Sequence, residues 1–102
     1  MTEDEAEVTA LQAIAFYAAR PDAMLRLLAA TGLTMEAMAA TASERATQAA
    51  VLDYLSRLDK DVIAFADETD RDPLDVFHAL RALDPTAFGE SPPAGLGRSR
   101  KR

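Results

Sequence analysis

Few side chains in this sequence have the types and spacing that chemistry requires. His78 is the only histidine and cysteine is absent, which excludes a multi-histidine metal site and a thiolate nucleophile. At helical spacing His78 shares a face with Asp75 and Arg81. We therefore expect a solvent-facing imidazole with an acid one turn earlier. The sequence predicts no enzyme, no catalytic residue, no bound cofactor and no metal.

Acidic side chains gather between residues 59 and 75. Clustered carboxylates can bind a hard cation, but this run lacks the glycine and the closing glutamate that a calcium loop needs at fixed positions. Helix caps and a solvated face explain most of these acids. The alternative is that they dock a basic partner or this chain's own tail. The candidate partner-binding acidic face consists of Asp67, Glu68, Asp70, Asp72 and Asp75.

Two smaller candidates come from the apolar segments. Met35 and Met38 lie in a short alanine-rich segment with little polar surface, which makes them a candidate apolar patch, with core packing as the alternative. Gln12 is the candidate buried structural polar residue of the first helix. We expect its amide to bond free backbone carbonyls at a neighbouring helix end.

The charge of the chain is unevenly distributed. The formal net charge is −6, but residues 1–97 hold all 17 acids and seven of the 11 basic residues. The body should repel nucleic acid and anionic membrane, and only the tail could attract them. The candidate nucleic-acid contacts are Arg98, Arg100, Lys101 and Arg102. Four charges predict weak, salt-sensitive binding, and an ordinary solubilising tail is the alternative.

The stretch over 8–19 is the segment around which the rest is expected to pack. It is apolar on nearly every side of a helix, which is typical of a central helix, and Thr2 and Glu5 precede it as a capping box. A second helix is predicted over 22–31, ended by Gly32 in the left-handed conformation, and a short helix capped by Thr34 follows it. Further helices are predicted over 44–58 with Ser43 as the cap, after Asp59 as a cap, and from Asp72 as a cap with Pro73 at the first helical position until Pro85. The residues expected on their inner faces include Met24, Leu25, Leu27, Leu28, Val51, Tyr54, Leu55, Leu58, Val62, Ile63, Phe65, Ala66, Val76, Phe77, Leu80 and Leu83.

These segments predict an all-α fold: a compact bundle of five to six short helices over residues 1–86. Residues 87–102 contain three of the four glycines and two of the five prolines, with few apolar residues, and we expect a disordered basic tail there. The acidic start of the chain lacks the basic residues and apolar run of a targeting peptide, so we expect a cytoplasmic protein.

Several short motifs together resemble a known family. The residues are Ala10-Leu11-Gln12-Ala13, Ala15-Phe16, Pro21, Leu27-Leu28, Thr31-Gly32-Leu33, Ala50-Val51-Leu52-Asp53-Tyr54-Leu55, Phe65-Ala66 and Asp72-Pro73. Over about residues 6–83 the chain is similar to a small alphaproteobacterial all-helical family of uncharacterised proteins. The resemblance implies no activity, but it implies a bacterial signalling context, since members are often encoded beside cell-cycle response regulators.

The chain departs from this family pattern at two turns. Arg20 replaces an aspartate before the proline of the second helix, where arginine cannot cap, so we expect a looser or more kinked junction. Asp70-Arg71 replaces a glycine before the last helix. We expect the turn to survive, because aspartate tolerates the left-handed conformation better than most residues.

From these observations we expect a non-enzymatic protein-interaction or adaptor domain of the bacterial cytoplasm, with an unidentified protein partner and no membrane contact. One alternative is a nucleic-acid-associated accessory protein that acts through the basic tail. The other is a small-molecule binder with a pocket between the first, second and fourth helices.

Overall fold

The first helix begins at the predicted capping box. The backbone N–H of Glu5 donates to Thr2 Oγ1 at 3.1 Å, and the backbone N–H of Thr2 donates to Glu5 Oε1 at 2.8 Å. The computed structural model describes residues 1–86, and in that part of the chain it contains six helices and no strand, as predicted. They are α1 (Glu3–Ala18), α2 (Pro21–Thr31), α3 (Met35–Ala40), α4 (Arg45–Ser56), α5 (Asp59–Thr69) and α6 (Leu74–Leu83).

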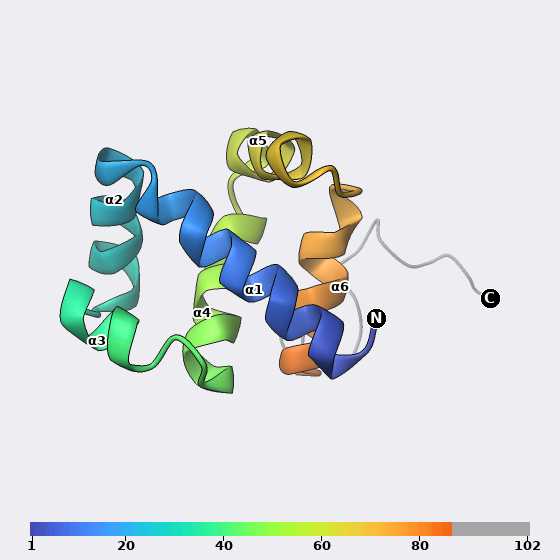
Figure 1. Ribbon diagram of the computed structural model, residues 1–102, viewed down its shortest axis with the longest axis horizontal. Helices are drawn as coiled ribbons and strands as arrows, with labels where there is room; N and C mark the ends of the chain where they lie inside the picture. The colour runs from blue at the N-terminus through green and yellow to red at the C-terminus, as the bar shows by residue number, and fades with distance from the viewer. Residues whose placement is uncertain (87–102) are drawn as a thin grey trace.

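Helix α1 is central, as its composition predicts. It crosses in front of α4 in Figure 1 and packs against α2, α4, α5 and α6. Its inner face carries three alanines that are fully buried, Ala6, Ala10 and Ala13. Small side chains let α4 and α6 come close to the backbone of α1, while Phe16 and Tyr17 fill the wider space toward α5.

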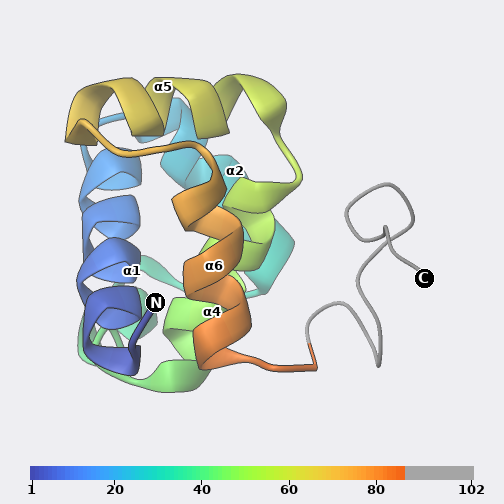
Figure 2. The same cartoon turned by 90° about the vertical axis from the view of Figure 1, so that its right-hand side faces the viewer.

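The core is formed where the inner faces of the other helices meet α1. Helices α4 and α6 supply most of it, and Figure 2 shows them side by side next to α1. Helix α2 contributes a narrow stripe and α5 closes one end of the bundle. The buried core residues of these helices are Met24, Leu27, Met38, Val51, Leu52, Leu55, Val62, Phe65, Val76, Ala79, Leu80 and Leu83.

Three predicted core residues prove to be exposed. Leu25 is 64% exposed and Ile63 is 57% exposed. Helices α2 and α5 each bury only a narrow stripe of side chains, which includes Met24 in α2 and Val62 in α5. Leu25 and Ile63 each follow one of these buried residues, so their side chains point toward solvent. Leu58, expected inside, is also 37% exposed because it lies at the turn before α5.

The predicted cap of α6 is displaced by one residue, because Pro73, not Asp72, occupies the cap position, although Asp72 Oδ1 accepts from the N–H of Leu74 at 2.8 Å. Two other predicted caps are wrong. Glu44, not Ser43, occupies the cap position of α4, and Leu58, not Asp59, precedes α5; neither makes a side-chain capping bond. The turn before α4 is held from inside the helix instead, because Gln48 Nε2 donates to the backbone oxygen of Ala42 at 3.0 Å. By contrast, Thr34 caps α3 as predicted, accepting from the N–H of Ala37 at 3.0 Å.

Left-handed backbone ends two helices where the sequence predicts it. Gly32 ends α2 with φ +77°, and Asp70 ends α5 with φ +56°. The turn at Asp70 therefore survives without glycine, as expected. The α1–α2 junction has Arg20 at the cap position without a capping bond, and Pro21 supplies the first residue of α2.

Across the described helices, none combines the length and apolarity that crossing a bilayer would require.

The two left-handed positions predict opposite responses to substitution. Gly32→Ala should lower the free energy of unfolding by about 1 kcal/mol, because the new Cβ meets no neighbour and only the backbone is strained. Asp70→Gly removes a Cβ from the same kind of conformation, so it should keep or raise stability. Urea denaturation followed by circular dichroism measures both. A loss on Asp70→Gly as large as that on Gly32→Ala would contradict the assignment.

Candidate functional site

The predicted acidic face is partly neutralised by local partners. Glu68 forms an ion pair with Arg20. Asp75 pairs with Arg71, with Nη1 and Oδ2 3.2 Å apart, and Asp72 Oδ1 accepts from the backbone N–H of Leu74 at 2.8 Å. The other two acids, Asp67 and Asp70, are exposed. Within residues 1–86, no three acidic or histidine side chains are grouped so as to hold a metal ion.

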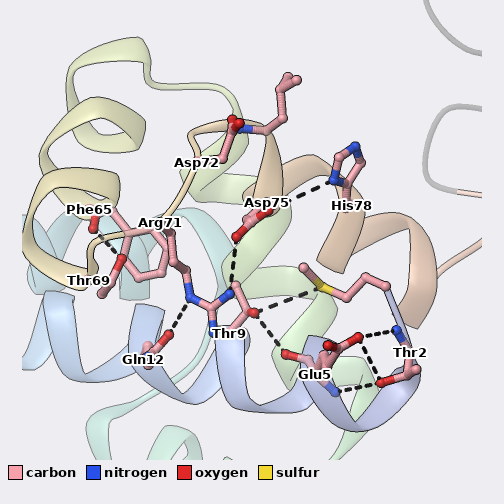
Figure 3. Close-up of polar contacts among 12 residues, drawn as sticks. Thr2, Glu5, Thr9, Gln12, Phe65, Thr69, Arg71, Asp72, Asp75 and His78 are labelled. Carbon is pink, nitrogen blue, oxygen red and sulfur yellow. Dashed lines mark hydrogen bonds and ion pairs between the residues drawn. The ribbon is translucent and has the colours of Figure 1, made fainter.

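Arg71 is the centre of the polar contacts drawn in Figure 3. Its Nε donates to Gln12 Oε1 at 2.6 Å, and its Nη1 donates to Asp75. The side chain of Arg71 is only 20% exposed. One guanidinium therefore joins α1 to α6 from the turn between α5 and α6.

This contact corrects the prediction for Gln12. The residue is half-buried, not buried, and its oxygen accepts from the Arg71 side chain; the amide does not cap a helix end as predicted. The polar residue of α1 that is fully buried is Thr9, whose Oγ1 donates to the backbone oxygen of Glu5 at 2.8 Å. A threonine can satisfy its hydroxyl within its own helix, so it tolerates burial better than an amide does.

His78 faces solvent beside Asp75, as helical spacing predicts. Its side chain is 58% exposed, and Nδ1 lies 4.0 Å from Asp75 Oδ1, which is beyond hydrogen-bond distance. The same region forms a depression of about 490 Å³ lined by Met1, Glu5, Val8, Arg71, Asp75 and His78. Hydrogen bonds from the backbone and hydroxyl of Thr2 lower the pKa of Glu5, so this rim carries a stable negative charge.

A second set of contacts ties the C-terminal half of α1 to α5, and sequence reasoning did not find it. Tyr17 donates its hydroxyl to Asp61 Oδ2 at 2.9 Å. Burial, together with this bond and the nearby Asp61 charge, raises the pKa of Tyr17. Arg20 lies over the ring of Phe16, with 3.8 Å between the guanidinium carbon and the ring centroid, and it also reaches Glu68. The sequence offered one signal for these contacts: Tyr17 and Arg20 place a hydroxyl and a guanidinium at the end of the apolar stretch of α1.

The predicted apolar patch does not exist as a pair. Met38 is 2% exposed and belongs to the core, whereas Met35, one turn earlier on α3, is 54% exposed. The two side chains lie on the same side of α3, but Met35 is the first residue of the helix and stays exposed there, whereas Met38, one turn further on, packs into the core. Core packing, the alternative for these residues, is therefore correct for Met38.

An apolar surface lies instead on the outer side of α1, which we call the α1 outer face: Val8, Leu11, Ala15 and Ala18. Val8 is 51% exposed and Leu11 is 42% exposed, and both alanines are exposed. Figures 1 and 2 both show this side of α1 uncovered by the other described helices. Of the helices in residues 1–86, only α1 carries two exposed large apolar residues within one turn.

Two further depressions lie against α4. One of about 650 Å³ is lined mainly by Ala46, Ala49, Ala50 and Leu83, with charged residues at its edge. The other, of about 300 Å³, lies between α2 and α4 and includes Ala30 and Tyr54. The second is near the interhelical pocket expected from the sequence, but α1 contributes no residue to it. The predicted tail contacts, Arg98, Arg100, Lys101 and Arg102, lie outside the described residues.

Comparison with known families places the whole bundle in one of them. A family model described as "Protein of unknown function (DUF3572)" matches residues 3–86. The chain belongs to this family. Neither the curated proteins nor the solved structures contain a significant match. The DUF3572 match takes in all six helices, so the α1 outer face and the Arg71 contacts both lie inside the family domain. The resemblance to an uncharacterised helical family is confirmed at this level.

The Tyr17–Asp61 bond predicts a pH dependence at alkaline pH. Because the pKa of Tyr17 is higher in the folded chain than its ordinary value near 10, the unfolded chain loses the proton first. The stability contributed by keeping this buried, hydrogen-bonded hydroxyl protonated is present below pH 10 and is lost as pH rises above it, by up to about 1.4 kcal/mol per pH unit. Tyr17→Phe should cost about 1 kcal/mol at neutral pH and remove this slope. Urea unfolding of both proteins between pH 8 and about pH 11 measures the difference, and equal slopes would contradict it.

The Arg71–Gln12 bond predicts a coupling between α1 and the turn before α6. A double-mutant cycle with Gln12→Ala and Arg71→Ala should give a coupling free energy of about 1 kcal/mol, because the bond is charge-assisted and partly buried. The control is the pair Arg57 and Asp53, whose side chains are 72% and 43% exposed. That pair should couple by less than about 0.5 kcal/mol. Equal couplings in denaturation experiments would show that the Arg71 contact has no special role.

Proposed function

We propose that this protein is a non-enzymatic protein-interaction domain that binds its partner through the α1 outer face. The observation that carries the proposal is the exposure of Val8 and Leu11 one turn apart on the central helix. Single exposed apolar residues are ordinary on protein surfaces, but a contiguous apolar strip is typical of an interaction site. Ala15 and Ala18 continue the strip along the same side of the helix.

The surroundings of this strip support a protein partner over a small ligand. Met1 is 45% exposed and lines the same depression as Val8, which widens the apolar surface at one end. The strip follows a helix whose outer side no other described helix covers in Figure 2, so it suits an extended partner surface. Each square ångström of apolar area covered there contributes about 25 cal/mol to binding before ordering costs are subtracted.

The narrower form of the proposal is an adaptor in bacterial signalling, working in the cytoplasm. Its support is the sequence resemblance to an alphaproteobacterial family and the strongly acidic body, which holds 16 acidic and seven basic residues in positions 1–86. An acidic body of this kind favours contact with proteins over nucleic acid or anionic lipid. Nucleic-acid binding through the tail would have to overcome the charge of this acidic body, and the depression between α2 and α4 lacks the α1 residues that were expected to line a ligand pocket.

The proposal predicts that one surface residue controls partner capture. Tagged full-length protein should retain one protein stoichiometrically from a nuclease-treated native lysate, and Leu11→Glu should reduce this at least about tenfold by placing a charge in an apolar contact. Val8→Glu is a second variant of the same face. Leu25→Glu is the matched control, because Leu25 is exposed to 64% on α2 and away from the strip.

Thermal melting of each variant separates loss of contact from loss of fold. Capture that survives both α1 substitutions in folded protein would overturn the assignment of the α1 outer face. If only nucleic acid is recovered, and only when residues 91–102 are present, the tail alternative replaces the proposal.

A further inference from the structure

We infer that the partner segment covering the α1 outer face is a helix antiparallel to α1, with lysine or arginine in its last turn. This inference rests on the proposed function and specifies the chemistry of the partner. It follows from how charge is arranged along the face.

The N-terminal end of the α1 outer face is strongly acidic. Asp4 falls on the same side of the helix as Val8 and Leu11, and Glu7 borders it. No ion pair formed within residues 1–86 involves Asp4 or Glu7, whereas the neighbouring Glu3 is already paired with Arg45 at 2.6 Å. Asp4 is exposed and Glu7 is half-buried, and both line a depression with Arg45, whose guanidinium is bound to Glu3. Within the described residues these two carboxylates thus have no ion pair of their own and can meet a cationic partner.

The C-terminal end of the α1 outer face carries only small, uncharged side chains. Ala15, Ala18 and Ala19 are exposed there, and α1 has no basic residue in its last turn. Alanine side chains let a second helix approach along the strip, which a bulky or charged surface would prevent. The face therefore offers close packing at one end and negative charge at the other.

An antiparallel helix matches this arrangement. Its C-terminal end would lie beside Asp4 and Glu7, where lysine and arginine are favoured by the negative end of the partner's own helix dipole. The two helix dipoles also oppose each other, which is the favourable arrangement. A parallel helix with the same charges would place its cations beside Ala15 and Ala18.

A second copy of this chain does not match the face. An antiparallel copy of α1 would bring Ala15 and Ala18 to Asp4 and Glu7, leaving both carboxylates without a cation. Each body also carries 16 acidic against seven basic residues over positions 1–86, so two copies repel one another. The charges favour a different, basic partner.

The test uses three synthetic amphipathic helical peptides with the same leucine and alanine face. One carries three lysines in its last turn, one carries them in its first turn, and one has glutamates in place of the last-turn lysines. Each is titrated into isotope-labelled full-length protein and followed by amide NMR shifts. The first should bind about tenfold more tightly than the second, which corresponds to two surface ion pairs, and should shift Val8, Leu11 and Ala15.

Asp4→Asn combined with Glu7→Gln should remove this preference, and the matched control Asp67→Asn, a similarly exposed acid on α5, should keep it. Equal binding of the two lysine peptides, binding of the glutamate peptide, or shifts away from α1 would each overturn the inference. None of these results affects the Leu11→Glu capture experiment, so partner chemistry and the use of the α1 outer face fail separately.

Discussion

The close approach of α4 and α6 to the inner face of α1 is the constraint on which the rest of the structure depends. Ala6, Ala10 and Ala13 are fully buried there, and both neighbouring helices pack against them. A larger side chain at any of these positions would push a helix outward, and overpacking of this kind typically costs about 1–3 kcal/mol. The alanines thus determine how near the core residues of α4 and α6 come to one another. The other helices of the bundle therefore pack around α1 and not around a symmetric central axis.

Polar contacts place the remaining helices relative to this central one. Helix α5 crosses the end of the bundle and has few residues near α1, so single contacts such as Tyr17 with Asp61 matter for its position. Asp70 then reverses the chain with left-handed backbone, and this turn brings Arg71 to Gln12 and Asp75. The turn at Asp70 therefore positions Arg71, and Arg71 in turn positions the start of α6 through Asp75. A chain with glycine at position 70 would make the same turn without changing what Arg71 reaches.

The sequence predicted those features whose signals are local. The capping box at Thr2, the left-handed ends at Gly32 and Asp70 and the central position of α1 all follow from residues a few positions apart. The exposure of Leu25 and Ile63 was not predictable in this way, because it depends on which neighbour covers each helix. The Gln12–Arg71 contact joins residues 59 positions apart. Nothing in the spacing of either residue indicates the other, so the polar centre of the molecule became visible only in three dimensions.

Core packing explains which residues occupy the inner face of α1, but it does not explain the apolar residues on the outer face. Val8 and Leu11 fill no space in the core, and polar residues there would keep the helix and improve solubility without disturbing Ala6, Ala10 or Ala13. Elsewhere on the bundle, exposed apolar residues stand singly and need no special cause. A contiguous strip on the helix that organises the whole core is different, because a partner bound there would contact the helix that packs against α2, α4, α5 and α6. In the proposed function this gives the partner a preorganised surface, so little ordering free energy is lost on binding.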